Sequence, residues 1–385
     1  MAEDKAFEQA AEVEKIIDRH EKEHLFVVNP RSFPHKSDMD AFVSRVGRVF
    51  KDAGLWAYHI HVSRYPRDAI GVVHKYIQGL PQGQPIRVYA VGGDGILFDC
   101  LNAVMGVEGA ELAAIPYGRE NDFVRAFGDK KEELFRDIAA QIAAPSVPTD
   151  VIRCDDNYAL NFCVVGLETM AIMWKIELSK RFSRARDFIP WFGSAAYYLS
   201  TAFASFNARI RSQEYQITVD GEVVNGNYVT IHISNGPCYG KTLAPVGEAV
   251  PDDGFLDLVL GRAQTIAGVL MVMLNYVRGR RKKPRLRFPE KVSLAHRRVR
   301  EVTIQSDRPL MVDLDGEAFF DTAIAVRVVP GGVRFVAPHE ARFVQRVPYD
   351  GGLGGGVGIR ENGVNGDVVN ENGADASSGG KGAGE

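Results

Sequence analysis

Apolar and polar residues alternate in the first part of the chain in a way that predicts strands and helices in turn. Short runs of consecutive apolar residues predict buried strands at 24–30, 56–62, 86–93 and 111–116. Longer amphipathic stretches predict helices at 4–22, 37–54, 66–79 and 131–144. Such alternation is typical of a parallel sheet with helices on both faces. We therefore expect an N-terminal helix within 1–22 and an α/β domain over 23–148.

Beyond a proline-containing linker at 145–148, the pattern becomes mostly β. Turn signals such as Asp220-Gly221 and Pro330-Gly331-Gly332 separate short apolar runs. These runs predict strands at 151–156, 158–167, 215–221, 227–236, 255–260, 300–306, 310–316, 324–329 and 333–338, interrupted by helical segments at 167–206 and 263–278. We expect a mostly antiparallel β-sandwich over 149–348, whose end can pack back on the first domain. The glycine-rich tail at 349–385 is expected to be disordered.

Composition supports an ordinary globular protein of two domains. The chain has 385 residues, of which 45% are hydrophobic and 25% charged. Its four cysteines lie far apart, which argues against a zinc site or a disulfide framework and suits a reducing cytoplasm. The longest apolar stretch, 266–277, is shorter than the roughly twenty residues that span a bilayer. We therefore expect a cytoplasmic protein whose contact with membranes is peripheral.

A glycine-rich loop follows the third predicted strand and opens a helix. It reads Gly92-Gly93-Asp94-Gly95. Glycines at such a turn let backbone N–H groups converge on an anion, and the helix N-terminus adds its positive dipole. Asp94 could hold a Mg²⁺ that bridges phosphate oxygens. The alternative is a tight turn capped by an aspartate, so the loop alone predicts only a phosphate-binding site.

Polar residues also follow the other predicted strands of this domain. In an open, Rossmann-like α/β sheet, ligands bind outside the carboxyl ends of the strands, so polar loops at that edge favour a nucleotide site. The residues of these loops that we expect at the site are Asn29, Pro30 and Ser32 after the first strand, Ser63 after the second, and Gly118, Arg119, Asn121 and Asp122 after the fourth.

These motifs resemble those of a known enzyme family. NPRS at 29–32, GGDGILFD at 92–99 and PYGRENDF at 116–123 are similar, in this order, to the diacylglycerol kinase catalytic domain. That superfamily includes bacterial lipid kinases and sphingosine kinases. Residues 161–170, 233–260 and 311–319 continue the resemblance, which covers about 24–345.

The resemblance implies an ATP- and Mg²⁺-dependent transfer of phosphate to a lipid hydroxyl of a diacylglycerol or a long-chain base. It gives Asp315 the role of general base, with Glu317 beside it as a metal or proton-network partner and Asp94 at the phosphates. It places Asp99 with the nucleotide-binding loops. A structural Mg²⁺ site is implied at Asp253, with carbonyl ligands from Val250 and Phe255.

The chain departs from the family pattern within the phosphate-binding loops. Ile96 and Arg119 replace threonines, and Glu120 places a carboxylate beside the phosphates. Arg119 could compensate as a bidentate phosphate ligand. We favour an active kinase and keep two alternatives open. One is a catalytically impaired pseudokinase that binds nucleotide or lipid, and the other is an enzyme of the NAD kinase type.

A strongly basic segment lies at 278–300, with eleven Lys or Arg and one Glu. Such a segment can attract an anionic membrane surface. Few aromatic residues accompany the charges, so we expect no nucleic-acid partner. Aromatic residues at 181–206 could line a lipid cleft, although residues of this kind are more often core. A homodimer is compatible with the sequence, which does not decide the oligomeric state.

Overall fold

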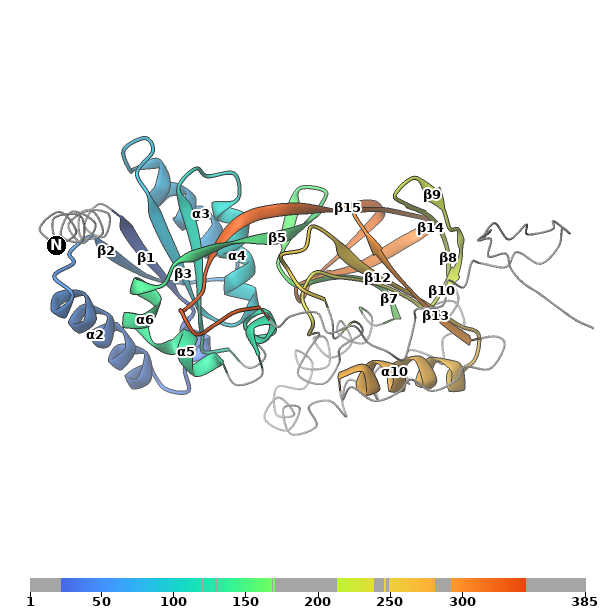
Figure 1. Cartoon of the computed structure of the whole chain (residues 1–385), viewed down its shortest axis with the longest axis horizontal. Helices are drawn as coiled ribbons and strands as arrows, with labels where there is room; N and C mark the ends of the chain where they lie inside the picture. The colour runs from blue at the N-terminus through green and yellow to red at the C-terminus, as the bar shows by residue number, and fades with distance from the viewer. Residues whose placement is uncertain are drawn as a thin grey trace, which may run out of the picture.

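The computed structural model describes residues 22–118, 121–128, 131–167, 169, 213–238, 246, 249–280 and 292–343. The predicted N-terminal helix, the aromatic segment at 181–206 and the tail lie outside these residues. The described chain forms an N-terminal α/β domain and a C-terminal β domain, joined by long strands (Figure 1).

The N-terminal sheet is parallel, as predicted. Its strand order is β2-β1-β3-β4, and each adjacent pair is parallel. The strands are β1 (Glu23–Val28), β2 (Tyr58–Val62), β3 (Ile86–Gly92) and β4 (Ala110–Pro116). Every residue of β3 and β4 is buried, which explains why these strands are continuous apolar runs in the sequence.

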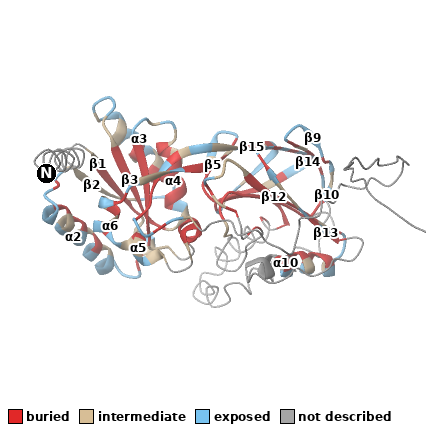
Figure 2. Ribbon diagram, in the orientation of Figure 1, coloured by how far each residue is buried: buried red, intermediate tan, exposed pale blue. Residues whose placement is uncertain are grey.

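Helices cover both faces of this sheet. On one face, α2 (Lys36–Asp52) buries Phe42, Val46 and Phe50 in a cluster with residues of β1 and β3. On the other face lie α3 (Asp68–Gln78) and α4 (Asp94–Val104), whose buried residues share a second cluster with the same strands. Figure 2 shows the result, with buried strands inside and an exposed outer side on α2.

The predicted helix at 131–144 is two short helices, α5 (Glu132–Arg136) and α6 (Ile138–Ala143). The break has a local cause. Asp137 has an extended backbone, and its Oδ1 accepts a hydrogen bond from Ala140 N at 3.1 Å, so it ends one helix and caps the next.

The C-terminal domain is an antiparallel sandwich, as predicted. Neighbouring strands pair in the order β13-β12-β11-β7-β14-β15, and β8 adds to β14. The strands are β5 (Ser146–Cys154), β6 (Asn157–Ala159), β7 (Phe162–Gly166), β8 (Gln213–Val219), β9 (Glu222–Val223), β10 (Gly226–Tyr228), β11 (Thr230–Ser234), β12 (Leu256–Ala263), β13 (Val292–Val299), β14 (Glu301–Leu314) and β15 (Glu317–Val336). The predicted second helix of this domain is α10 (Ile266–Arg280). Inward-facing residues of β7, β8, β11, β12 and β14 share one apolar core.

Two long strands connect the domains. β5 and β15 run antiparallel beside each other, and the end of β15 pairs in parallel with β4, with Arg334 opposite Glu111 (Figure 1). The proline-containing segment at 145–148, expected to be a linker, is therefore mostly the beginning of β5. It pairs with the last residues of β15, so hydrogen bonds replace the expected loop.

Among the described residues, no helix has the length and apolar character needed to cross a bilayer.

Candidate active site

The glycine-rich loop Gly92–Gly95, called the phosphate loop below for its predicted role, joins β3 to α4. It packs against the loops that follow neighbouring strands. Tyr117 N and Gly118 N both donate to Gly92 O at 2.9 Å. A Cβ atom on Gly92 would lie 3.0 Å from Ser32 Oγ and 3.1 Å from Asn29 Cβ. The polar ends of β1, β3 and β4 thus meet at one edge, as the sequence predicts.

Two glycines make this close approach possible. A Cβ on Gly118 would overlap the Gly93 Cα and come within 2.8 Å of Asn121 Oδ1. The nearest of these atoms belongs to the backbone of Gly93, so the two loops would have to separate.

Gly118→Ala is therefore expected to weaken ATP binding by about 5- to 150-fold, because overpacking of this kind costs roughly 1–3 kcal/mol. Titration calorimetry would measure the affinity. Gly71→Ala is the matched control, since Gly71 has no atom within 4 Å of its Cβ position and lies within α3. Equal affinity in Gly118→Ala and wild type would contradict the role of this contact.

Asp94 connects the phosphate loop to the loop after β4. Its Oδ1 accepts a hydrogen bond from Asp122 N at 2.9 Å. Asn121, in the left-handed region with φ 50°, donates from Nδ2 to Gly118 O at 2.9 Å. Asp122 is buried, with its Oδ1 3.1 Å from Arg125 Nη1. These bonds orient two carboxylates and an amide at the N-terminus of α4.

Asp315 and Gly316 form the tight turn between β14 and β15. Both have positive φ, 50° and 92°, as two-residue hairpin turns require. The turn places Glu317 beside the phosphate loop, where Glu317 Oε1 is 3.6 Å from the Cβ position of Gly95. A segment from the C-terminal domain thus reaches the phosphate loop of the N-terminal domain.

The Asp315 side chain is turned inward. Its carboxylate accepts from Leu160 N at 2.7 Å, Phe162 N at 2.8 Å and Asn161 N at 3.0 Å. Burial raises the pKa of Asp315 to about 7, against the opposing effect of these three donors. Asn161 N also lies 3.2 Å from the second carboxylate oxygen, so both oxygens are held by backbone donors. Asp315 is thus a fixed carboxylate whose pKa is close to neutral.

Asp99 lies on α4 near Glu317. Burial raises the pKa of Asp99 to about 6, the nearby Arg67 lowers it, and the Glu317 charge raises it further. The carboxylate is 3.6 Å from Arg67 Nη1. The sequence did not single out Arg67. Its position in the loop after β2, at the same edge as Ser63, is the signal that could have found it.

The remaining first-domain candidates lie at this edge too. Asn29 caps the 3-10 turn η1 (Pro30–Ser32), and its Oδ1 accepts from Arg31 N at 3.1 Å. Ser63 N donates to Val28 O at 2.8 Å. Arg119 and Glu120 lie outside the described residues.

Asp94 lies in the glycine-rich loop and Glu317 lies beside Gly95. Proteins bind Mg²⁺ through one or two carboxylates of this kind together with substrate phosphates. Asn121 Oδ1 adds a buried oxygen without a hydrogen-bond partner among the described residues. Within the same residues, no group of three or more His, Cys, Asp or Glu is arranged as a self-contained metal site.

The predicted structural metal site lies in the loop before β12, with Val250 at its start. There Asp253 Oδ2 is 2.7 Å from Arg298 Nη2, and Asp253 Oδ1 accepts from Phe255 N at 3.1 Å. The Arg298 guanidinium also lies 4.3 Å from the centroid of the Phe255 ring. A metal at Asp253 would have to displace this arginine, and the site stays a prediction.

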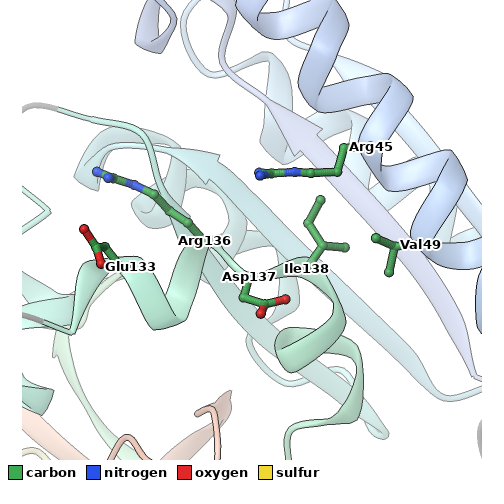
Figure 3. Close-up of a pocket in the computed structure, with 6 residues that line it drawn as sticks. All are labelled: Arg45, Val49, Glu133, Arg136, Asp137 and Ile138. Atoms are coloured by element: carbon green, nitrogen blue, oxygen red, sulfur yellow. The ribbon is translucent and has the colours of Figure 1, made fainter.

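A cavity of about 400 Å³ lies away from these residues, between α2, α5 and α6 (Figure 3). It is lined by Arg45, Val49, Glu133, Arg136, Asp137 and Ile138. None of the predicted site residues lines it.

The basic segment at 278–300 is described only in part, since 281–291 lie outside the described residues. At its end, Arg297 pairs with Glu222 at 2.7 Å and Arg298 with Asp253. Arg300 lies over the Phe255 ring. These three arginines therefore already have partners within the fold.

Two family models match the chain in the order of its domains. Residues 23–154 match the diacylglycerol kinase catalytic domain. Residues 178–337 match the YegS C-terminal NAD kinase beta sandwich-like domain. The N-terminal domain belongs to the diacylglycerol kinase catalytic domain family. The resemblance identified from the motifs is thereby confirmed.

Curated relatives agree with this family. A protein named "Putative lipid kinase" from Staphylococcus epidermidis (strain ATCC 12228 / FDA PCI 1200) is 27% identical over 256 residues, 66% of this chain and 77% of the relative. One of the same type from Staphylococcus aureus (strain JH9) is 25% identical over 289 residues, 73% of this chain and 88% of the relative.

Solved structures show the same fold. A crystal structure described as that of a "putative diacylglycerol kinase" from Bacillus anthracis str. Sterne superposes with a TM-score of 0.61 at 22% identity. The match covers 82% of this chain and 97% of that one. This chain therefore has the same fold as this Bacillus anthracis structure.

Proposed function

We propose that this protein is a lipid kinase that transfers the terminal phosphoryl group of ATP to a lipid hydroxyl, with Asp315 as the general base. The observation that carries the proposal is the position of the Asp315–Glu317 turn. It comes from the second domain and lies against the phosphate loop, with Glu317 Oε1 3.6 Å from the Cβ position of Gly95. A phosphate donor and a base for the acceptor would therefore share one site.

Each part of the site has a role in this reaction. The Gly92–Gly95 loop and the N-terminus of α4 bind the phosphates. Asp315 takes the proton of the lipid hydroxyl while the hydroxyl oxygen bonds to the terminal phosphorus of ATP. The bond between that phosphorus and the ADP oxygen breaks. A carboxylate whose pKa is about 7 suits this step near neutral pH. Three backbone N–H donors fix the orientation of the Asp315 carboxylate. Such positioning matters because catalysis of phosphoryl transfer depends mainly on the placement of the reacting groups.

Mg²⁺, when bound, would neutralise the phosphate charge. Asp94 and Glu317 are the residues proposed to hold it, and the backbone N–H of Asp122 orients the Asp94 carboxylate. Asp94 and Asp122 are already held in position by hydrogen bonds within the fold. The acceptor is proposed to be a diacylglycerol or a long-chain base, and a cytoplasmic location, peripheral membrane contact and a homodimer stay predictions.

Purified protein is expected to bind ATP in the presence of Mg²⁺ and to transfer labelled phosphate to extracted lipids, and not to NAD. Calorimetry with and without Mg²⁺ measures the first step, and thin-layer separation of the labelled lipids the second. Binding without transfer to any lipid would favour the pseudokinase alternative. Labelling of NAD would favour the NAD kinase type, and no ATP binding at millimolar concentration would exclude a kinase.

A further inference from the structure

The loop between β2 and α3 is held firmly at the edge of the sheet where the phosphate loop lies. Ser63 N donates to Val28 O, and Asp68 Oδ2 accepts from Arg64 N at 2.8 Å. His61 Nε2 is 2.9 Å from the same oxygen of Asp68. Because Asp68 is buried and begins α3, the residue before it has a fixed position.

That residue, Arg67, has a backbone conformation that favours glycine. Its φ of 65° and ψ of 7° lie in the left-handed region, which is unfavourable for a side chain of this size. The backbone N–H of Arg67 donates a hydrogen bond to Asp99, so this conformation directs both the backbone and the side chain of Arg67 towards one carboxylate. Residues in strained backbone conformations cluster at functional sites, so the contacts of the Arg67 side chain bear on function.

The guanidinium of Arg67 lies between the two domains. Its Nη1 is 3.6 Å from Asp99 Oδ1 on α4, and its Nη2 is 3.5 Å from Glu317 Oε2 on β15. It also lies 4.9 Å from the centroid of the Phe98 ring. Glu317 in turn faces Gly95, so the cation stands between the phosphate loop and the Asp315–Glu317 turn.

These two ion pairs do not occupy all the N–H donors of the Arg67 guanidinium. Close charge-assisted bonds measure about 2.7–2.9 Å, shorter than both distances, and arginine has five N–H donors. The side chain is 45% exposed. Arg125, by contrast, is buried against Asp122 and Glu132. Arg67 is thus placed to bind a further anion where the carboxylates alone would repel one.

We propose that Arg67 binds the terminal phosphate of the donor nucleotide, with Asp99 and Glu317 holding the guanidinium in place. This inference rests on the proposed function, because it assigns a residue to the ATP site. The strain at Arg67 would then be the cost of directing a cation to the point where the phosphoryl group is transferred.

Arg67→Gly tests this inference without adding backbone strain, because glycine adopts the φ of 65° readily. ATP affinity by calorimetry is expected to fall by about 10- to 100-fold, as loss of a hydrogen bond to a charged group implies. ADP and AMP, which lack that phosphate, are expected to bind within about threefold of wild type. Turnover with a lipid acceptor should fall by about a thousandfold, in the range known for catalytic arginines.

Arg64→Ala is the matched control, since it removes an exposed arginine from the same loop. It should leave ATP affinity near the wild-type value, and the melting temperatures of both variants should stay close to that of wild type. Equal loss of ATP, ADP and AMP binding in Arg67→Gly would show a purely structural role and overturn the inference. Unchanged ATP binding in Arg67→Gly would overturn it while leaving the kinase proposal intact. Failure of wild type to bind ATP would overturn both.

Discussion

Replacing Asp315 with asparagine is expected to lower turnover by about 10²- to 10⁴-fold and to leave ATP affinity nearly unchanged, because a general base contributes that much and does not contact the donor. Asparagine retains an acceptor oxygen for only one of Leu160 N and Phe162 N, because these two groups donate to different oxygens of the carboxylate. Labelled-phosphate transfer at saturating ATP measures the rate, and calorimetry measures the affinity.

A control must separate the loss of a base from disturbance of the turn. Asp313→Asn serves this purpose, because Asp313 Oδ1 accepts from Gly316 N at 2.8 Å and supports the same turn. This variant is expected to keep most of the activity. If Asp315→Asn transferred phosphate at the rate of Asp313→Asn, Asp315 would not be the base.

The pH dependence of the wild type gives an independent check on Asp315. A base acts in its deprotonated form, and burial raises the pKa of Asp315 to about 7. The value of kcat/KM is therefore expected to rise about tenfold per pH unit below this pKa and to level off above it. A profile that is flat from about pH 6 to 8 would contradict the assignment.

Phe335→Ala is expected to reduce the free energy of unfolding by about 3–5 kcal/mol, the usual cost of removing a large aromatic from a core. Phe335 belongs to the end of β15 and is fully buried in the N-terminal domain. Its ring centroid lies 4.9 Å from that of Phe123 and 5.8 Å from that of Phe127. Phe123 and Phe127, which lie just after the predicted phosphate-binding motifs, thus pack against the end of β15. Urea unfolding measures the effect.

Phe320→Ala is the matched control on the same strand. Phe320 is 57% exposed, so its loss should change the unfolding free energy by no more than about 0.5 kcal/mol. Similar values for the two variants would mean that the return of β15 to the first domain adds little stability.

Local patterns were enough to predict the parallel sheet and the first half of the site. Runs such as 24–30 and 86–93 are apolar throughout because parallel strands are covered on both faces. Since the carboxyl ends of such strands share one edge, Asn29, Asp94 and Asn121 could be expected to meet there. The strand predicted at 310–316 ends at Leu314, and Asp315-Gly316, a pair that two-residue hairpins favour, forms the turn.

Other features depend on contacts between residues far apart in the chain, which no local pattern encodes. The proline-containing segment at 145–148 became a strand because β15 offers it a hydrogen-bonding partner. The residues around Asp253 in the sequence predict a metal ligand, but in the structure the Arg298 side chain of β13 lies beside its carboxylate. The inward position of Asp315 arises when the β6–β7 segment folds against the turn after β14. The place of Arg67 between Asp99 and Glu317 arises when the two domains pack. Sequence thus determined the strands, their polar ends and the family. Tertiary packing decided which charges face one another across the site, because pairing of side chains is set by distance in space.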